Sequence, residues 1–439
     1  MTTSNTKMGY GVVNTGYSQG AVGEIIDNGT PTINKEVVTQ VGSDNLSGDP
    51  RVLAFRDAAN AERALVVSYK YDPSTWQPGD PEFLICNPAQ KTAGKWNAVK
   101  TLSHSDWSQL SNPYGIATIG SNMFVADYDN ACIAKIDMSG NAYTQSSALF
   151  YPFPAITGYQ SHCASIGLLE SDDAAFLVAL FNHATADYSA YLSSTLVLID
   201  PDDASSAVYF GPHGSTTTGT LGQNAVSMTV TGNYAYVSSY GGMQQGGGNP
   251  NSKLQVVRIL LSPSVSFSII NTFSSSSTNL GDFVGTAISG SAAYVLRANY
   301  TPTWQQYRYQ VYPTTTSNLQ TGTALPAARY YGDEPPAAGS GYPGVTWMVA
   351  AESSRVWFVC GDTVKGIDTA NATDNVYDFN KGLADLGNSP KNGHLNTAAI
   401  VQHGVSNTAV QHPAFASRTQ AALKLRKALL EEREKKAEK

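Results

Sequence analysis

A repeating three-strand pattern constrains the fold of this chain more than any other feature of the sequence. Its clearest copy is the segment 112–137, where short apolar runs are separated by turns at 120–122 and 128–130. Runs of this kind, bounded by Gly, Asn and Asp, are typical of antiparallel strands. The pattern recurs at intervals of roughly 50 to 63 residues, with copies starting near Asp49, Asn112, His162, Gln223, Asp282 and Gly344.

The two ends of the chain supply the missing parts of a seventh unit. The segment 395–402 has the pattern of a first strand with no partners downstream, whereas 10–14, 21–27 and 33–39 have that of later strands with no first strand upstream. Pairing the two ends would remove the open sheet edges that favour aggregation. We therefore predict an all-β fold, a seven-bladed β-propeller closed by pairing of N-terminal and C-terminal strands. A set of stacked β-sandwiches with coincidental spacing is the alternative.

The pattern also suggests how the chain is divided. The repeat runs through residues 9–412, which we expect to form one propeller domain, and the polar residues 1–8 are expected to be disordered. In the segment 413–439, a capping box at Ser417–Gln420 precedes a run of Ala, Leu, Glu and Lys. These residues favour a short charged α-helix. We expect this helix or tail to be free or weakly attached, or to pair with a partner helix in self-association.

Charge and hydropathy exclude some partners. The net charge is −7, and outside the basic last 22 residues the chain has 19 basic against 30 acidic side chains. An acidic body without a basic stripe argues against nucleic acid. We find no apolar run of about 18 residues, so no membrane span is expected. The low charged fraction of 14% is common in exported proteins, and we expect an extracellular, cell-surface or periplasmic protein whose signal peptide is not in this sequence. A cytoplasmic protein is the alternative.

The four cysteines are Cys86, Cys132, Cys163 and Cys360, and each falls within a strand pattern. None has the spacing of a metal site. We expect them to be buried as small apolar side chains. A disulfide between neighbouring blades, such as Cys132 with Cys163, is the alternative.

Long loops are the first place where a ligand could bind. In a propeller, the loops between second and third strands lie on the face where the chain enters each first strand. Aromatic rings and amides at such a mouth suit a glycan or a protein segment. The alternative is that these aromatics pack their own loops. The predicted ligand-binding residues are Tyr71, Asp72, Trp76, His183, Tyr188, Tyr240, Asn251, Tyr300 and Trp304.

Polar residues at the channel rim form a second candidate site. The rim residues are Asp49, Asn112, Tyr114, His162, Gln223, Asn224, Asp282, Tyr342, His394 and Asn396. If the protein is an enzyme, its catalytic candidates are Asp49, His162, Asp282 and His394. No cofactor is expected, although oxygen ligands of this type suit Ca²⁺, with weak candidates Asp49, Asn112, Asn224 and Asp282. The acidic segments 127–130 and 200–203 lack EF-hand spacing and are interpreted as turns.

The units 112–137 and 224–260 resemble the bacterial seven-bladed propellers of the YVTN/NHL/lactonase-like group. The likeness rests on an apolar strand, a tight turn and a strand such as Gly232–Val237, and it spans residues 9–402 as a repeat pattern. Members of that group include lactonases, lyases, surface-layer proteins and interaction scaffolds, so the resemblance implies a fold more than an activity. The rim residues lack the Glu of the gluconolactonase-like metal set.

These observations lead to three functional hypotheses. The first is a non-enzymatic secreted or cell-surface propeller that binds a glycan or protein on its long-loop face. The second is a hydrolase, lactonase or lyase at the channel mouth with a bound divalent cation. The third is a structural subunit of a surface assembly. No phosphate loop, nucleophile elbow or H-E-x-x-H motif is found in the sequence.

Overall fold

The structure is a computed structural model. It describes the backbone of residues 6–16, 19–27, 37–39, 51–71, 78–92, 95–171, 174–242, 250–262, 264–275, 281–301, 306–328, 330–334, 347–352, 355–360, 363–368, 376–378 and 394–399. Side chains are described for Val22 and for residues 52–69, 79–92, 95–171, 174–242, 250–262, 264–275, 281–298 and 310–328. The C-terminal segment 413–439, for which a helix was predicted, lies outside these ranges.

The described strands form small antiparallel sheets, each built from consecutive strands except at the chain ends. The first sheet joins β29 (His394–Ala399) to β1 (Thr6–Gly16), β2 (Gln19–Asp27) and β3 (Val37–Thr39). The second has β4 (Arg51–Arg56), β5 (Glu62–Tyr71), β6 (Pro78–Thr92) and β7 (Lys95–Leu102). The third has β8 (Pro113–Ile119), β9 (Asn122–Asp127), β10 (Cys132–Asp137), β11 (Thr144–Gln145) and β12 (Tyr151–Pro152).

The remaining sheets repeat the same order. They are β13 (Gln160–Ser171), β14 (Ala174–Ala184), β15 (Thr195–Ile199) and β16 (Val208–Phe210), followed by β17 (Ala225–Thr231), β18 (Tyr234–Ser239), β19 (Lys253–Leu260) and β20 (Ser266–Ser274). Next come β21 (Asp282–Ser289), β22 (Ala292–Thr301), β23 (Gln306–Thr315) and β24 (Tyr330–Glu334), and then β25 (Trp347–Glu352), β26 (Arg355–Cys360), β27 (Thr363–Asp368) and β28 (Val376–Asp378). The strands predicted within 112–137 are confirmed.

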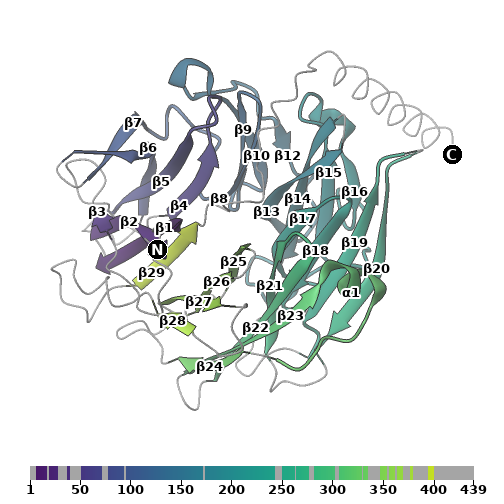
Figure 1. The fold of residues 1–439 in the computed structure, drawn as a ribbon. Coiled ribbons are helices and arrows are strands. Elements are labelled where there is room, and N and C mark those ends of the chain that lie inside the picture. Colours follow the sequence, from purple (N-terminus) through teal and green to yellow (C-terminus); the bar gives the residue numbers. More distant parts are fainter. Residues whose placement is uncertain are drawn as a thin grey trace.

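The sheets are arranged around a common centre, with the first strand of each sheet innermost (Figure 1). The first strands contact one another in the series β29, β4, β8, β13, β17, β21 and β25. Among the described side chains, buried apolar clusters fill the spaces between neighbouring sheets from the first sheet round to the β21–β24 sheet. The four sheets from β4 to β20 are therefore covered on both faces, and this explains why β14 is buried along nearly its whole length rather than alternating.

The chain ends meet in one sheet. Strand β29 is antiparallel to β1, with Tyr10 opposite Ala399 and Asn14 opposite His394. Residues 1–8 were expected to be disordered; this is corrected for residues 6–8, because β1 begins at Thr6 and pairs Thr6 with Asp27, whereas residues 1–5 lie outside the described residues. Strand pairing satisfies the backbone groups of these polar residues, so the segment needs no apolar pattern of its own.

A register irregularity recurs near the start of the first strands. In β8, Pro113 and Gly115 pair with consecutive residues of β9, so Tyr114 is left out of the pairing. The same shift occurs in β13, β17, β21, β25 and β29. Such bulges bend a strand and redirect the unpaired side chain. In β8 the redirected side chain is a tyrosine.

The helical elements are short. The 3₁₀ turns η1 (Ser139–Asn141) and η2 (Ala204–Ser206) follow β10 and β15. The helix α1 (Thr316–Thr321) was not predicted, because six residues are too few to show helical periodicity. Thr315 caps its N-terminus, Gly322 ends it at φ 74°, and the Asn271 amide donates to the carbonyls of Leu319 and Gln320.

Among the described side chains, Cys86, Cys132 and Cys163 are free and buried, as expected. The alternative of a Cys132–Cys163 disulfide is therefore not found. Burial raises the pKa of Cys86 and of Cys132 to about 12, so both remain thiols. In the part of the chain that the structure describes, no helix is long and apolar enough to cross a bilayer.

Candidate functional site

A buried carboxylate positions the start of β8. Asp127, at the end of β9, accepts hydrogen bonds from the backbone N–H groups of Ser111 (2.7 Å), Asn112 (2.6 Å) and Asn130 (2.9 Å), and from Ser111 Oγ (3.1 Å). Burial raises its pKa, although the N–H groups favour the charged form. The turn interpretation of 127–130 is confirmed, and Asp200 and Asp203 likewise bind backbone N–H groups of their own turn.

Four rings lie in one stack near the first residues of β8 and β13. The ring centroids of Tyr114 and Tyr128 are 4.5 Å apart with 28° between their planes. Those of Tyr128 and His162 are 4.4 Å apart at 18°, and those of His162 and Tyr188 are 6.0 Å apart at 16°. We call these four residues the aromatic stack.

The two ends of the aromatic stack are open to solvent. Tyr114 is 38% exposed and Tyr188 is 41% exposed, and the only other exposed large apolar side chain in the described residues is Leu149. Burying such rings would normally be favourable. A stack that leaves both terminal rings exposed therefore provides two apolar faces for a flat ligand.

His162 is held in the middle of the stack in a defined protonation state. Its Nδ1 lies 3.3 Å from the backbone carbonyl of Tyr128. A carbonyl can only accept, so Nδ1 carries the hydrogen. Burial lowers the pKa of His162, and the neutral ring then has an unprotonated Nε2. This Nε2 is buried and has no hydrogen-bond partner among the described residues.

His183 does not reach the mouth, so its prediction as a ligand-binding residue is corrected. Strand β14 extends to Ala184, which places His183 inside the sheet, fully buried. Its Nδ1 pairs with Ser161 Oγ and its Nε2 with Thr195 Oγ1, both at 2.9 Å. Burial, and to a lesser degree the nearby His162, lower its pKa to about 3. Both nitrogens are occupied, and the ring is a structural element.

Tyr188 sits at the tip of a tight turn that extends β14. The Tyr188 N–H donates to the Thr185 carbonyl (2.8 Å), and Thr185 N–H donates to the Ala190 carbonyl (2.9 Å). The Asp187 carboxylate accepts from Thr185 and Ser189 hydroxyls, which lowers its pKa to about 2. Tyr188 has φ 56°, a left-handed conformation that is unfavourable for a bulky residue. Such outliers occur at ligand-binding positions.

Two residues from the sheets that follow along the chain, Tyr240 and Asp282, lie near Tyr114. Tyr240 is only 5% exposed, and its pKa is raised by burial and by the proximity of Asp282 and Tyr114. Asp282 is fully buried at the start of β21. Arg297 donates to Ser275 Oγ (2.5 Å) and to the Gly281 carbonyl (2.7 Å) and lies over the Phe283 ring (4.6 Å). Burial lowers the pKa of Arg297.

Apart from His183, the predicted residues divide into three groups. In the first group, His162 and Tyr188 lie in the aromatic stack, Tyr240 and Asp282 lie near Tyr114, and the Asn112 and Asn224 amides donate to Asp129 Oδ2 (3.0 Å) and to the Gly242 carbonyl (2.9 Å). Asn251 is exposed in the turn that precedes β19. The others lie outside the described side chains: Asp49, Tyr71, Asp72, Trp76, Tyr300, Trp304 and His394. Tyr128 was not nominated from sequence, because it lies in the predicted 128–130 turn. Only its spacing from Tyr114 could have suggested that the two rings pair.

No metal centre is evident in the part of the mouth that can be described. Among the described residues, no group of three or more His, Cys, Asp or Glu side chains could hold a metal ion. Asp49, one of the four weak candidates for Ca²⁺, lies outside that set. A calcium ion stays a prediction from sequence.

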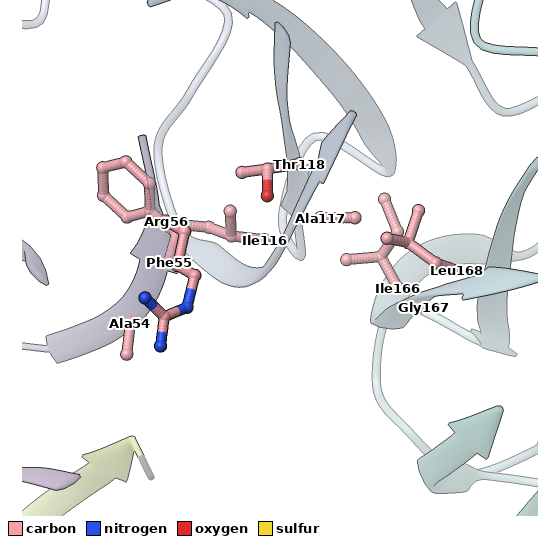
Figure 2. Close-up of a pocket in the computed structure, with 9 residues that line it drawn as sticks. All are labelled: Ala54, Phe55, Arg56, Ile116, Ala117, Thr118, Ile166, Gly167 and Leu168. Atoms are coloured by element: carbon pink, nitrogen blue, oxygen red, sulfur yellow. The ribbon is translucent and has the colours of Figure 1, made fainter. Parts of the chain in front are cut away.

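A second feature is a cavity of about 110 Å³ between the inner strands β4, β8 and β13 (Figure 2). It is lined by Ala54, Phe55, Arg56, Ile116, Ala117, Thr118, Ile166, Gly167 and Leu168. The Arg56 guanidinium is the charged group of this lining, and its Nη1 donates to the Asn60 carbonyl at 3.0 Å. The lining residues follow the bulges in β8 and β13, so the cavity lies deeper along the inner strands than the aromatic stack.

Comparison with known proteins supports the fold alone. No family profile and no curated protein matches the chain. Among solved structures, a protein provisionally assigned as a 6-phosphogluconolactonase from Bacteroides fragilis has a TM-score of 0.52 at 13% identity, covering 87% of this chain and 95% of the other. A similarly assigned protein from Bacteroides uniformis has 0.49 at 14%, covering 85% and 95%. The periplasmic gluconolactonase of Pseudomonas aeruginosa has 0.47 at 11%, covering 84% and 94%.

Proposed function

We propose that this chain, which resembles the lactonase-like β-propellers in its fold, binds a carbohydrate at the aromatic stack. The observation that carries the proposal is the exposure of Tyr114 and Tyr188 at the two ends of one stack. The apolar faces of sugar rings lie against aromatic rings, and their hydroxyls bind amides and carboxylates. Asn112 and Asp129 supply such groups beside Tyr128. A protein ligand presenting a flat, hydroxyl-rich segment would use the same surface.

The scaffold of this proposal is a closed seven-bladed propeller. Support comes from the series of contacts between first strands and from the pairing of β29 with β1. The recurring bulge near the start of six first strands supports their equivalence as blades. Closure would hold the mouth rigid, which suits a binding site assembled from separate blades. We also propose an extracellular or periplasmic location, which the low fraction of charged residues favours.

Binding to a glycan array tests the proposal. Truncating an exposed aromatic anchor costs about 1–2 kcal/mol at a typical interface, or roughly 5- to 30-fold in Kd. We expect Tyr114→Ala and Tyr188→Ala each to weaken binding by this amount. Leu149→Ala is the matched control, because Leu149 is similarly exposed (36%) but outside the stack. Equal binding by all three variants would remove the aromatic stack as the site.

A lactone hydrolase is the second candidate, favoured by the neutral His162 with its unpaired Nε2 and by the fold of the Bacteroides protein. A neutral imidazole can accept a proton from water during ester hydrolysis. The test is hydrolysis of glucono-1,5-lactone and its 6-phosphate, with His162→Phe as the control variant. Turnover that is lost in His162→Phe would support the enzyme. No turnover above the spontaneous rate would exclude these two substrates.

A further inference from the structure

The unpaired Nε2 of His162 is the strongest unexplained feature of the mouth. His162 is 5% exposed, and the Nε2 atom is buried without a partner in the described residues. Buried polar atoms are nearly always hydrogen-bonded, and leaving one unpaired costs free energy. Asn112, whose backbone carbonyl accepts from the Tyr128 N–H, has a side-chain Oδ1 that is also buried without a partner there. A ligand or ordered water that supplies a donor would satisfy either atom.

The required chemistry of the missing partner follows from the tautomer. Because Nδ1–H is used by the Tyr128 carbonyl, Nε2 can act only as an acceptor. Asn112 Oδ1 is an acceptor as well. The ligand must therefore present hydrogen-bond donors, and hydroxyl groups are the donors that an uncharged sugar carries.

The charges around the aromatic stack disfavour an anion. Asp129 follows Tyr128 and is exposed, and its carboxylate accepts from Asn112 Nδ2. Asp187 precedes Tyr188, is exposed, and has a pKa lowered to about 2. Asp187 is therefore negative at neutral pH, and Asp129 adds a second exposed acidic side chain. A phosphorylated or sulfated sugar placed between them would be repelled.

The Tyr188 side of the stack is the looser one. The Tyr188 centroid is 6.0 Å from that of His162, compared with 4.4 Å on the Tyr128 side. The turn that carries Tyr188 is fixed by its own hydrogen bonds, so its exposed ring can rotate without moving the turn. The strained φ of Tyr188 is consistent with a position selected for a function other than stability.

We propose that His162 Nε2 accepts a hydrogen bond from a hydroxyl of an uncharged polyol, and that the ligand reaches it when the Tyr188 ring swings aside. This inference rests on the proposed carbohydrate binding and names the ligand class. Tyr188 acts as a movable ring that covers His162 in the free protein and packs against the ligand once it has swung aside. Tyr128 is the fixed ring beneath, and His162 is the group that recognises a hydroxyl. The two flanking carboxylates exclude phosphorylated sugars.

The first experiment needs no ligand. Diethyl pyrocarbonate modifies unprotonated imidazole nitrogens, and mass spectrometry of peptides gives the rate at each histidine. We expect His162 to react at least roughly 10-fold faster in Tyr188→Gly than in wild type, because its protecting ring is gone. Glycine suits the left-handed backbone, so this variant keeps the turn. Tyr114→Ala, which removes the ring at the other end of the aromatic stack, is the matched control and should leave the rate unchanged.

Two other histidines serve as internal references. His104 is half-buried and also has Nδ1 near a backbone carbonyl, that of Leu110 (3.2 Å), so it reports the reactivity of an accessible Nε2. His183 should not react while the fold is intact. Equal His162 rates in wild type, Tyr188→Gly and Tyr114→Ala, with His183 protected, would overturn the role of Tyr188 as a cover. If His183 became reactive in Tyr188→Gly, the fold of that variant would be disturbed, and the His162 rate would be measured in Tyr188→Asn instead, because Asn also tolerates this backbone.

The second experiment compares neutral glycans with phosphorylated and sulfated glycans on the array. We expect binding of neutral glycans alone, weakened roughly 5- to 150-fold in His162→Phe, which keeps the ring and removes the acceptor. Binding that His162→Phe retains, or a preference for anionic glycans, would refute this inference and leave the proposed function standing. No glycan binding by wild type would refute the proposed function, whereas the modification rates would still decide whether Tyr188 covers His162.

Discussion

Replacing Asp127 should destabilise the mouth in a graded way. Its Oδ2 accepts the N–H groups of Ser111 and Asn112, and its Oδ1 accepts that of Asn130 together with Ser111 Oγ. Asp127→Ala leaves three backbone donors without acceptors, at about 1–3 kcal/mol for each that stays buried. Ser111 and Asn112 are half-buried and Asn130 is exposed, so water satisfies part of the loss. We expect the free energy of unfolding to fall by about 2–4 kcal/mol.

Asp127→Asn should lie between wild type and Asp127→Ala. One amide oxygen can replace Oδ2, while the NH₂ group can donate to Ser111 Oγ but not accept from Asn130. We expect a cost of about 1–2 kcal/mol. Asp129→Asn is the control, because the exposed Asp129 accepts only from Asn112 Nδ2 among the hydrogen bonds identified, and its change should stay within about 0.5 kcal/mol.

Urea unfolding followed by tryptophan fluorescence measures these differences, provided that the dependence on urea is the same in each variant. The diethyl pyrocarbonate rate at His162 gives a second readout, since a displaced 111–114 segment would disturb the aromatic stack. The reasoning is refuted if Asp127→Ala is as stable as Asp129→Asn, or if the Asn and Ala variants at position 127 are equally destabilised.

Three further predictions concern other described residues. The folded-state pKa of His183 is about 3, below the unfolded value of ~6.5, so its contribution to stability is present above pH ~6.5 and is lost as pH falls towards 3. Between about pH 7.5 and 5, the free energy of unfolding measured in urea should fall by about 2 kcal/mol less in His183→Gln than in wild type. An identical pH dependence of the two proteins would contradict this. Tyr188→Gly should be about 1 kcal/mol more stable than Tyr188→Ala because φ is 56°, whereas equal unfolding midpoints would argue against strain. Gly211→Ala should cost more than about 3 kcal/mol of stability, since φ is 133° and a Cβ would lie 2.6 Å from the Ser194 carbonyl oxygen. The control Gly120→Ala, at φ 60° with open space around it, should cost only about 1 kcal/mol. Similar thermal midpoints for the two variants would be inconsistent with a steric cause.

Residue patterns in the sequence were sufficient to predict the strands and much of their grouping. Period-two apolar runs and turn residues located β8, β9 and β10, because these signals depend on neighbours along the chain. The end-to-end pairing could be expected from an unpaired first strand at 395–402. The helix α1 could not, since its six residues depend on caps at Thr315 and Gly322 and on burial of Leu319.

The site was only partly predictable for a physical reason. Tyr114, His162 and Tyr188 were each nominated from sequence, but their stacking depends on contacts between two sheets. The prediction of His183 as a ligand-binding residue was wrong because β14 continues past the expected loop boundary, which places the imidazole ring in the core and not at the rim. A one-residue shift changes the face of a strand that a side chain occupies, and the bulge at Tyr114 makes such a shift.

The sequence by itself therefore determined an all-β chain of repeated sheets and the residue types at their inner ends. Tertiary structure alone decided which of those side chains are exposed, paired or left without a partner. Local patterns encode hydrogen bonding along and between adjacent strands, whereas the environment of His162 depends on Tyr128 and Tyr188, contributed by two different sheets.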